Sequence, residues 1–342
     1  MLFVCQIHGE DGHWFREKNF QKLLDEQTHS VARSGNQIKL LINGAHAFEQ
    51  RIKNIQNADV IFIKTFEFWN DKSGSAILKL LTKKARNGAK VFIQFDVKGT
   101  TGPIASTSMN DIKQGRSSPI PDYLQKFVEE SRGNGFVIPT NMPNSLINSN
   151  IYVLKDHEKT FITWEYKNRP ASVKVIMGGM NTGDMYLLGG EKNSKGGCET
   201  VDFYQSEGFS GPDVLPMRDT DVEIIGSVTQ DVLRRFILAA EFQLNNPSDI
   251  FKRDFMPHIK EAILEMKLIE KNMHYNSAIA FPTDIGSAFL RFIYKNTNQY
   301  GSKDVLNVHN FFQLALQSVP SRTTVQIAAG FFYANQKLVE IN

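Results

Sequence analysis

The sequence has few cysteines, no long apolar run and no basic leader. Its two cysteines, Cys5 and Cys198, form neither a metal-binding spacing nor a disulfide framework, so we expect thiols. No apolar run reaches the roughly 18 residues that a membrane-spanning helix needs. The stretch from Met1 to Cys5 lacks a basic flank and is too short for a signal peptide. We therefore expect a cytoplasmic or membrane-peripheral protein, unless a leader lies outside this sequence.

The chain also has little net charge. A formal charge of +3 over 342 residues permits anionic partners without requiring a nucleic acid. No basic stripe interleaved with aromatic residues, which would favour nucleic-acid binding, is found. With 41% hydrophobic and 22% charged residues, the composition is that of a globular chain long enough for two domains.

Apolar strands and amphipathic helices alternate in the first hundred residues, which implies layered α/β architecture. We expect helices over residues 13–34, 45–58 and 74–87, and strands over residues 37–44, 59–66 and 90–96. Further on, the pattern predicts a mobile loop over 99–118, acting as a lid or as a disordered insert, a helix over 121–132, a loop over 139–143, a possible strand over 199–204 and a helix over 231–243.

A β-hairpin is the centre of the functional interpretation. Residues 160–166 and 173–177 alternate and are rich in β-branched and aromatic side chains, and residues 167–170 carry turn chemistry. His157 and Lys159, two positions apart, point to one face. Gly178 and Gly179 close the second strand where a backbone must approach another group closely, and Asn181 follows. Imidazole, ammonium, carboxamide and backbone amides together suit a phosphate.

These residues resemble the signature of the phospholipase D superfamily, H-x-K-x4-D-x6-G-[GS]-x-N, at His157, Lys159, Gly178, Gly179 and Asn181. The chain departs from the signature in two ways. Trp164 stands at the Asp position, with Glu165 beside it, and the hairpin is longer than the signature's, as an insertion at its tip allows. Glu165 and Asp184 are candidate supporting residues: Glu165 as a substitute for the Asp, although it faces the other side of the strand, and Asp184 either orienting the histidine or capping amides of a neighbouring loop.

Two flanking segments are similar to bacterial cardiolipin synthase-like phospholipase D proteins. Residues 178–186 resemble G-G-x-N-I-G-D-x-Y, and residues 217–226 resemble W-R-D-x-H-V-x-I-x-G, with Met217 and Asp221 in place of Trp and His. The second segment joins two halves in such proteins. The resemblance therefore implies a first half over residues 1–216, carrying the His-x-Lys motif, and the beginning of a second half over 217–342.

The fold implied is a phospholipase D-like α/β/α sandwich with a mixed, largely parallel sheet and a second, similar half that is incomplete. No second His-x-Lys followed by a glycine pair occurs in the sequence. His258-Ile259-Lys260 has the spacing, but the surrounding periodicity is helical. His309 is more typical of a core or rim histidine. We expect the second half-site to come from a missing C-terminal region or from a homodimer mate.

The resemblance implies catalysis by a pair of histidines through a phosphohistidine, with His157 as one of the pair. Lys159 and Asn181 would hold phosphoryl oxygens, Gly178 and Gly179 would bind phosphate, and no metal or cofactor is implied. The expected function is a phosphodiesterase or phosphatidyltransferase acting on phospholipids, with peripheral membrane contact. A nuclease on the same scaffold and a catalytically incomplete half that binds anionic lipid or a protein partner remain alternatives. Phe66, Phe68 and Trp69 are expected in the core, or lining an acyl-chain or base pocket.

Overall fold

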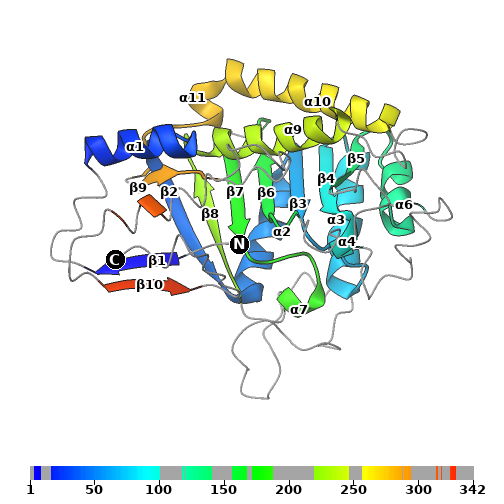
Figure 1. The fold of residues 1–342 in the computed structure, drawn as a ribbon. Coiled ribbons are helices and arrows are strands. Elements are labelled where there is room, and N and C mark those ends of the chain that lie inside the picture. The colour runs from blue at the N-terminus through cyan, green and yellow to red at the C-terminus, as the bar shows by residue number, and fades with distance from the viewer. Residues whose placement is uncertain are drawn as a thin grey trace.

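The structure is a computed structural model, which describes residues 4–8, 17–100, 118, 120–140, 156–167, 172–187, 219–245, 256–286, 288–293, 313–314, 317 and 324–328. Within these residues an eight-stranded sheet has the order β5-β4-β3-β6-β7-β8-β2-β9 (Figure 1). A separate antiparallel pair joins β1 (Val4–His8) to β10 (Thr324–Ala328).

The large sheet is mixed, as expected, and more antiparallel than expected. Only β3 with β4 and β4 with β5 pair in parallel among the described strands, because the chain then returns through the antiparallel hairpin of β6 and β7. Its strands are β2 (Ala32–Ile42), β3 (Val60–Thr65), β4 (Lys90–Asp96), β5 (Gly135–Thr140), β6 (Thr160–Trp164), β7 (Val173–Gly178), β8 (Thr220–Ile225) and β9 (Ala288–Arg291).

Helices cover both faces of the sheet, which confirms the α/β/α layering (Figure 1). Along β3, Ile61 and Ile63 pack with the side of α2 and α3, whereas Val60 and Phe62 pack with the side of α9 and α10. The helices are α1 (Lys18–Thr28), α2 (Asn43–Asn57), α3 (Lys72–Arg86), α4 (Val97–Thr100), α6 (Asp122–Glu130), α7 (Asp184–Leu187), α9 (Thr229–Asn245), α10 (Met256–Tyr275) and α11 (Ser277–Ala280). No described helix is long and apolar enough to cross a membrane.

Some expected elements change. The first helix ends at Thr28, and residues from Ala32 onward already belong to β2. Residues 139–143 were expected as a loop, but Pro139 lies inside β5, which pairs with β4. The helical prediction around His258 is confirmed, because His258 lies in α10 and its Nε2 accepts a hydrogen bond from the Val137 amide at 3.2 Å.

The strand that follows residue 216 joins the same sheet as the strands before it. β8 pairs with β7 on one side and with β2 on the other, and α9 packs behind this sheet. β8, which the sequence assigned to the second half, thus belongs to the sheet of the first half. The division into two halves at residue 216 stays a prediction. Residues 101–117 of the expected lid, the possible strand 199–204 and His309 lie outside the described residues.

Candidate active site

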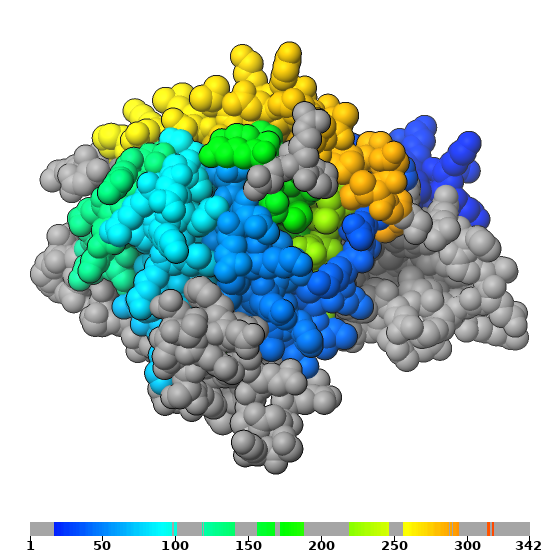
Figure 2. Space-filling model, turned by 180° about the vertical axis from the view of Figure 1, so that it is seen from behind, coloured from blue at the N-terminus to red at the C-terminus, as the bar shows by residue number. Residues whose placement is uncertain are grey.

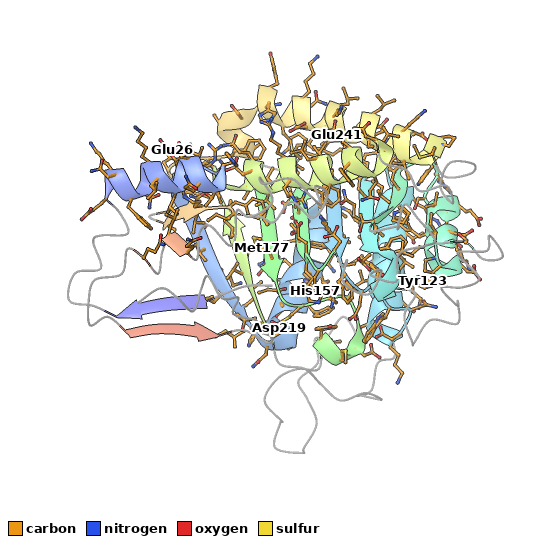
Figure 3. The ribbon with its side chains drawn as sticks, viewed as in Figure 1. Glu26, Tyr123, His157, Met177, Asp219 and Glu241 are labelled. Atoms are coloured by element: carbon orange, nitrogen blue, oxygen red, sulfur yellow. The ribbon has the colours of Figure 1, made fainter. Side chains whose placement is uncertain are left out.

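The hairpin brings the predicted residues to one end of the sheet. His157 and Lys159 precede the first residue of β6, and Gly178 ends β7, whose Met177 pairs with Thr160. The neighbouring strand β3 ends at the same place with Thr65, since β3 and β6 are antiparallel partners. Figure 3 shows His157 and Asp219 at this end of the sheet.

His157 and Lys159 are in direct contact. The Lys159 Nζ lies 2.8 Å from Nδ1 and 3.2 Å from Nε2 of His157, and it donates to the His157 carbonyl at 3.1 Å. The imidazole packs on the Phe66 ring with 4.6 Å between centroids, and Nζ lies 5.5 Å from that same ring. His157 is exposed whereas Lys159 is buried. The arrangement presents an imidazole to solvent with a cation held beneath it.

Burial sets the charge state of this cation. Desolvation lowers the pKa of Lys159 to about 8, against the opposing effect of nearby carboxylates, led by Glu67 and Asp219. Burial also raises the pKa of Asp219, and the charge of Asp221 adds to the effect. The ammonium is therefore charged at neutral pH, and acidic groups surround it.

Asn181 is fully engaged by the protein. Its Oδ1 accepts hydrogen bonds from the Thr65 hydroxyl at 3.2 Å and the Glu67 amide at 3.1 Å. Its Nδ2 donates to Glu67 Oε2 at 3.1 Å and to the Tyr186 hydroxyl at 2.7 Å, and Tyr186 in turn donates to Glu67 Oε2 at 2.9 Å. Both ends of the carboxamide already have protein partners, and a role for Asn181 in holding a phosphoryl oxygen stays a prediction. Asn181 orders the segment that carries Phe66.

The glycine pair makes room for two acidic side chains: Asp221 of β8, and Asp219, which directly precedes β8. A Cβ at Gly178 would lie 2.3 Å from Asp221 Oδ1, and a Cβ at Gly179 would lie 2.1 Å from both carboxylate oxygens of Asp219. Close approach, predicted from the sequence, is thus confirmed, and the group that approaches is a carboxylate. Phosphate binding by these two glycines stays a prediction.

A buried ion pair holds the loop after β7. Arg51 of α2 contacts Asp221 at 2.6 Å, with side-chain exposures of 7% and 0%. Arg51 also donates to the carbonyls of Met180 at 2.9 Å and Asn181 at 3.3 Å. The pair anchors the backbone of the Gly-Gly-x-Asn segment to α2.

The two candidate supporting residues have different locations. Asp184 accepts a hydrogen bond from the Ser73 amide at 2.7 Å, and its own amide donates to Asp71 at 2.7 Å. It therefore caps the start of α3, the structural alternative considered for it. Glu165 follows the far end of β6 and pairs with Lys174 at 2.8 Å. Its proposed substitution for the missing Asp is wrong, because it lies at the opposite end of the strand from His157.

The residues flanking His157 are held by a buried lysine. Lys64 of β3 lies 3.1 Å from Asp156 and 2.9 Å from Glu158. Burial alone would raise the pKa of Glu158, but the charges of Lys64 and Arg235 hold it down at about 2. Both neighbours of His157 are thus fixed on the sheet, and its ring is left at the surface.

Sequence reasoning missed most of the residues around the histidine. Glu67 and Arg51 carry no motif signal of their own, Tyr186 lies in the family-like segment without a role assigned to it, and Phe66 was assigned mainly to the core. Asp219 and Asp221 lie in the segment that resembles the family, but their contact with the glycine pair is visible only in three dimensions.

No family model matches the chain. A cardiolipin synthase A from Pseudomonas putida (strain W619) is 28% identical over 196 residues, which cover 57% of this chain and 31% of that protein. A cardiolipin synthase A from Pseudomonas aeruginosa (strain LESB58) is 34% identical over 80 residues, 23% of this chain and 16% of that protein. These relatives confirm the resemblance to the phospholipase D superfamily. The chain spans less than a third of their length.

Solved structures that are similar to this chain share little sequence identity with it. NucT from Helicobacter pylori has 14% identity and a TM-score of 0.36, with 60% of this chain and 96% of that chain covered. The phosphatidylserine synthase of Haemophilus influenzae Rd KW20 has 15% identity and a TM-score of 0.41, with 81% of this chain and 52% of that chain covered.

Proposed function

We propose that this chain provides the histidine half-site of a phospholipase D-type phosphodiesterase or phosphatidyltransferase that acts on phospholipids. The observation that carries the proposal is the contact between the Lys159 ammonium and the ring of exposed His157. An ammonium donates only to an unprotonated ring nitrogen, and that form of imidazole attacks phosphorus. The cardiolipin synthase relatives support phospholipid as the substrate class.

In the proposed reaction the Lys159 ammonium moves its hydrogen bond from the unprotonated ring nitrogen to a phosphoryl oxygen of the substrate. The freed lone pair of that His157 nitrogen forms a bond to phosphorus, and the bond from phosphorus to the leaving oxygen breaks. The leaving alkoxide takes a proton from an acid, which we assign to a second histidine outside this half-site or in a homodimer mate. Water or an alcohol then attacks the phosphohistidine, loses its proton to that same group and frees His157. Lys159 stabilises the negative charge on the phosphoryl oxygens throughout.

The test uses vesicles that contain phosphatidylglycerol and measures glycerol release and exchange. We expect His157→Ala to lower turnover by roughly 10²–10⁴-fold, while the control His274→Ala, an exposed histidine of α10, leaves it unchanged. Acid quenching of labelled substrate with the native chain should trap a labelled histidine. Equal turnover by His157→Ala would remove His157 from the mechanism. Nicking of plasmid DNA in the presence of chelator, without lipid turnover, would favour the nuclease alternative.

One observation favours a second candidate, a half that binds anionic lipid without turnover. The Asn181 carboxamide is engaged by Glu67 and Tyr186, which leaves the Lys159 ammonium as the group that would bind an anionic headgroup. In that case anionic vesicles would retain the chain in flotation, no phosphohistidine would form, and Lys159→Met would weaken retention while His157→Ala would not.

A further inference from the structure

A groove of about 550 Å³ lies between α3 and α6. The two helices pack against each other, and the view from behind shows α3 in cyan beside α6 in blue-green (Figure 2). His157 precedes the first residue of β6, whereas the groove lies in the helical layer, so the groove is separate from the candidate active site. Its volume falls within the range of small-molecule sites.

Positive charge dominates the described lining of this groove. The charged side chains are Lys79, Lys83 and Arg86 of α3, together with Lys126 and Glu130 of α6. Four cations therefore accompany one carboxylate. This excess of three positive charges equals the formal net charge of the whole chain, +3. A large share of the uncompensated positive charge of the chain is thus gathered at one groove.

The one carboxylate is shared by two cations and does not neutralise the groove. Glu130 lies 2.7 Å from the Arg86 guanidinium and 3.9 Å from Lys126 Nζ. The Arg86 Nε also donates to the Glu130 carbonyl at 3.0 Å, so Arg86 is held more firmly than Lys126. Lys83 is exposed and forms no ion pair within the described part of the chain. Lys83 and Lys126 can therefore bind an added anion from opposite sides.

Helix formation explains only part of this charge. α3 carries five lysine and arginine residues and no Asp or Glu. The helix dipole favours cations in the last turn, where Lys83 and Arg86 lie. It does not account for Lys79, whose charge opposes that of Lys83 four positions later, or for Lys126 on the facing helix. An anion in the groove would offset these repulsions.

The lining beneath these charges is apolar and poorly solvated. Leu78, Thr82 and Phe127 line the groove and are buried. Opposite charges attract each other more strongly beside a region of low dielectric constant than in bulk water. An anion between the two helices would therefore be held more firmly than one on an open surface of equal charge.

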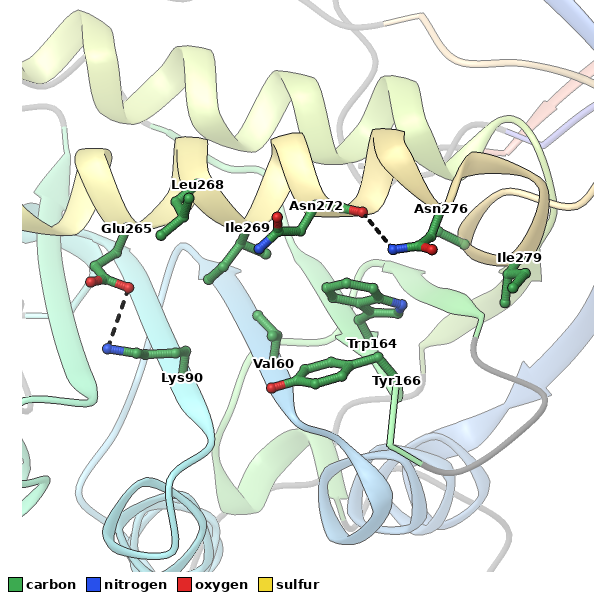
Figure 4. Close-up of a pocket in the computed structure, with 11 residues that line it drawn as sticks. Val60, Lys90, Trp164, Tyr166, Glu265, Leu268, Ile269, Asn272, Asn276 and Ile279 are labelled. Carbon is green, nitrogen blue, oxygen red and sulfur yellow. Dashed lines mark hydrogen bonds and ion pairs between the residues drawn. The ribbon is translucent and has the colours of Figure 1, made fainter.

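The cavity between the end of β6 and α10 differs from this groove in charge (Figure 4). Its volume is about 460 Å³, and the two ionic side chains described in its lining, Lys90 and Glu265, lie 3.3 Å apart. Their charges cancel, so that lining offers an anion no unpaired cation. Among these two cavities, the positive excess belongs to the groove between α3 and α6.

We propose that the groove between α3 and α6 binds a phosphate monoester. Such a group carries a charge of about −1.5 to −2 at pH 7, which suits several cations better than a singly charged anion does. Lys83 and Lys126 bind its oxygens as point charges from the two helices, and Arg86 adds donors in a planar fork. The monoester belongs either to a soluble compound or to a lipid headgroup, since both present the same anion. The site does not depend on turnover at His157.

The soluble source is tested by calorimetric titration with glycerol 3-phosphate at low salt. We expect the native chain to bind it and the double variant Lys83→Gln/Lys126→Gln to bind at least tenfold more weakly, because two charge-assisted contacts are lost. Both lysines are exposed, so the variant should keep the native melting transition. The matched control Lys90→Gln/Lys267→Gln removes the same formal charge at two lysines that pair with glutamates elsewhere, and should bind like the native chain.

The lipid source is tested by flotation with phosphatidylcholine vesicles that contain phosphatidic acid. Retention that falls in Lys83→Gln/Lys126→Gln, without binding of glycerol 3-phosphate, assigns the groove to a lipid headgroup, and the reverse assigns it to a soluble compound. Lys159→Met should behave like the native chain in both assays, which separates this site from the proposed catalytic one. The proposal is overturned if neither ligand depends on Lys83 and Lys126, if the matched control weakens binding equally, or if Lys159→Met abolishes binding.

Discussion

The carboxylate of Asp219 occupies the space that a side chain at Gly179 would need, with both oxygens 2.1 Å from the position of a Cβ. The need for glycine at position 179, the second residue of the glycine pair, is thus set by Asp219, which lies forty positions further along the chain. A methyl group at Gly179 forces the acid away from the start of β8 and from Lys159, whose charge acts on it.

We predict that Gly179→Ala lowers the free energy of unfolding by about 1–3 kcal/mol through overpacking. Urea unfolding measures the change. Adding Asp219→Ala to this variant should recover part of the loss, because the second substitution removes the atoms that clash. A double-mutant cycle with no coupling between the two positions would show that the loss has another origin.

The ion pair between Arg51 and Asp221 should be essential for stability. Removing one partner leaves a buried charge without compensation, so we expect Arg51→Met to cost about 3–5 kcal/mol. The control is Arg86→Met, which breaks the pair with Glu130, where side-chain exposures are 45% and 36%, and should cost about 1 kcal/mol or less. If chemical denaturation showed similar losses of unfolding free energy for both variants, the buried pair would contribute no more to stability than the exposed pair.

Much of the sheet could be predicted from local pattern. β3 and β4 are short apolar runs, and α3 is amphipathic and ends before Gly88, whose φ of +92° fits the predicted C-cap. β5 could not be predicted, because Pro139 argues against a strand. It is tolerated here because β5 lies at the edge of the sheet.

The site was predictable only where it depends on sequence spacing. His157 and Lys159 are two residues apart, so their shared face follows from strand periodicity. The partners of Asn181 depend instead on β3 lying beside β6 and on the turn that leads to Tyr186. Glu67 lies more than a hundred positions from Asn181, and no local pattern connects them.

The pKa of Lys159 should make stability depend on pH above neutrality. In the unfolded chain Lys159 has the ordinary lysine pKa of 10.5, whereas in the folded chain its pKa is about 8. Between these values the unfolded state binds more protons, so this group makes stability rise with pH from about 8 to 10.5. We expect Lys159→Met to lack that rise in urea unfolding at pH 8, 9 and 10, relative to the native chain. A parallel pH dependence in both would show that Lys159 has an ordinary pKa.

The Tyr186 hydroxyl links Asn181 to Glu67. Its removal should show whether this network only stabilises the fold or also positions His157 for turnover. Tyr186→Phe leaves one Asn181 donor without its partner and removes one of the hydrogen bonds to the Glu67 carboxylate, so we expect a loss of about 1–3 kcal/mol. If the network positions Phe66 under His157, turnover of lipid should fall more than thermal unfolding explains, with the larger effect on kcat rather than KM. The matched control is Tyr166→Phe, a half-exposed tyrosine at the other end of the hairpin, which should leave kcat unchanged. Equal kcat values for Tyr186→Phe and the native chain at a temperature where both are folded would show that the hydroxyl stabilises the fold without positioning the histidine.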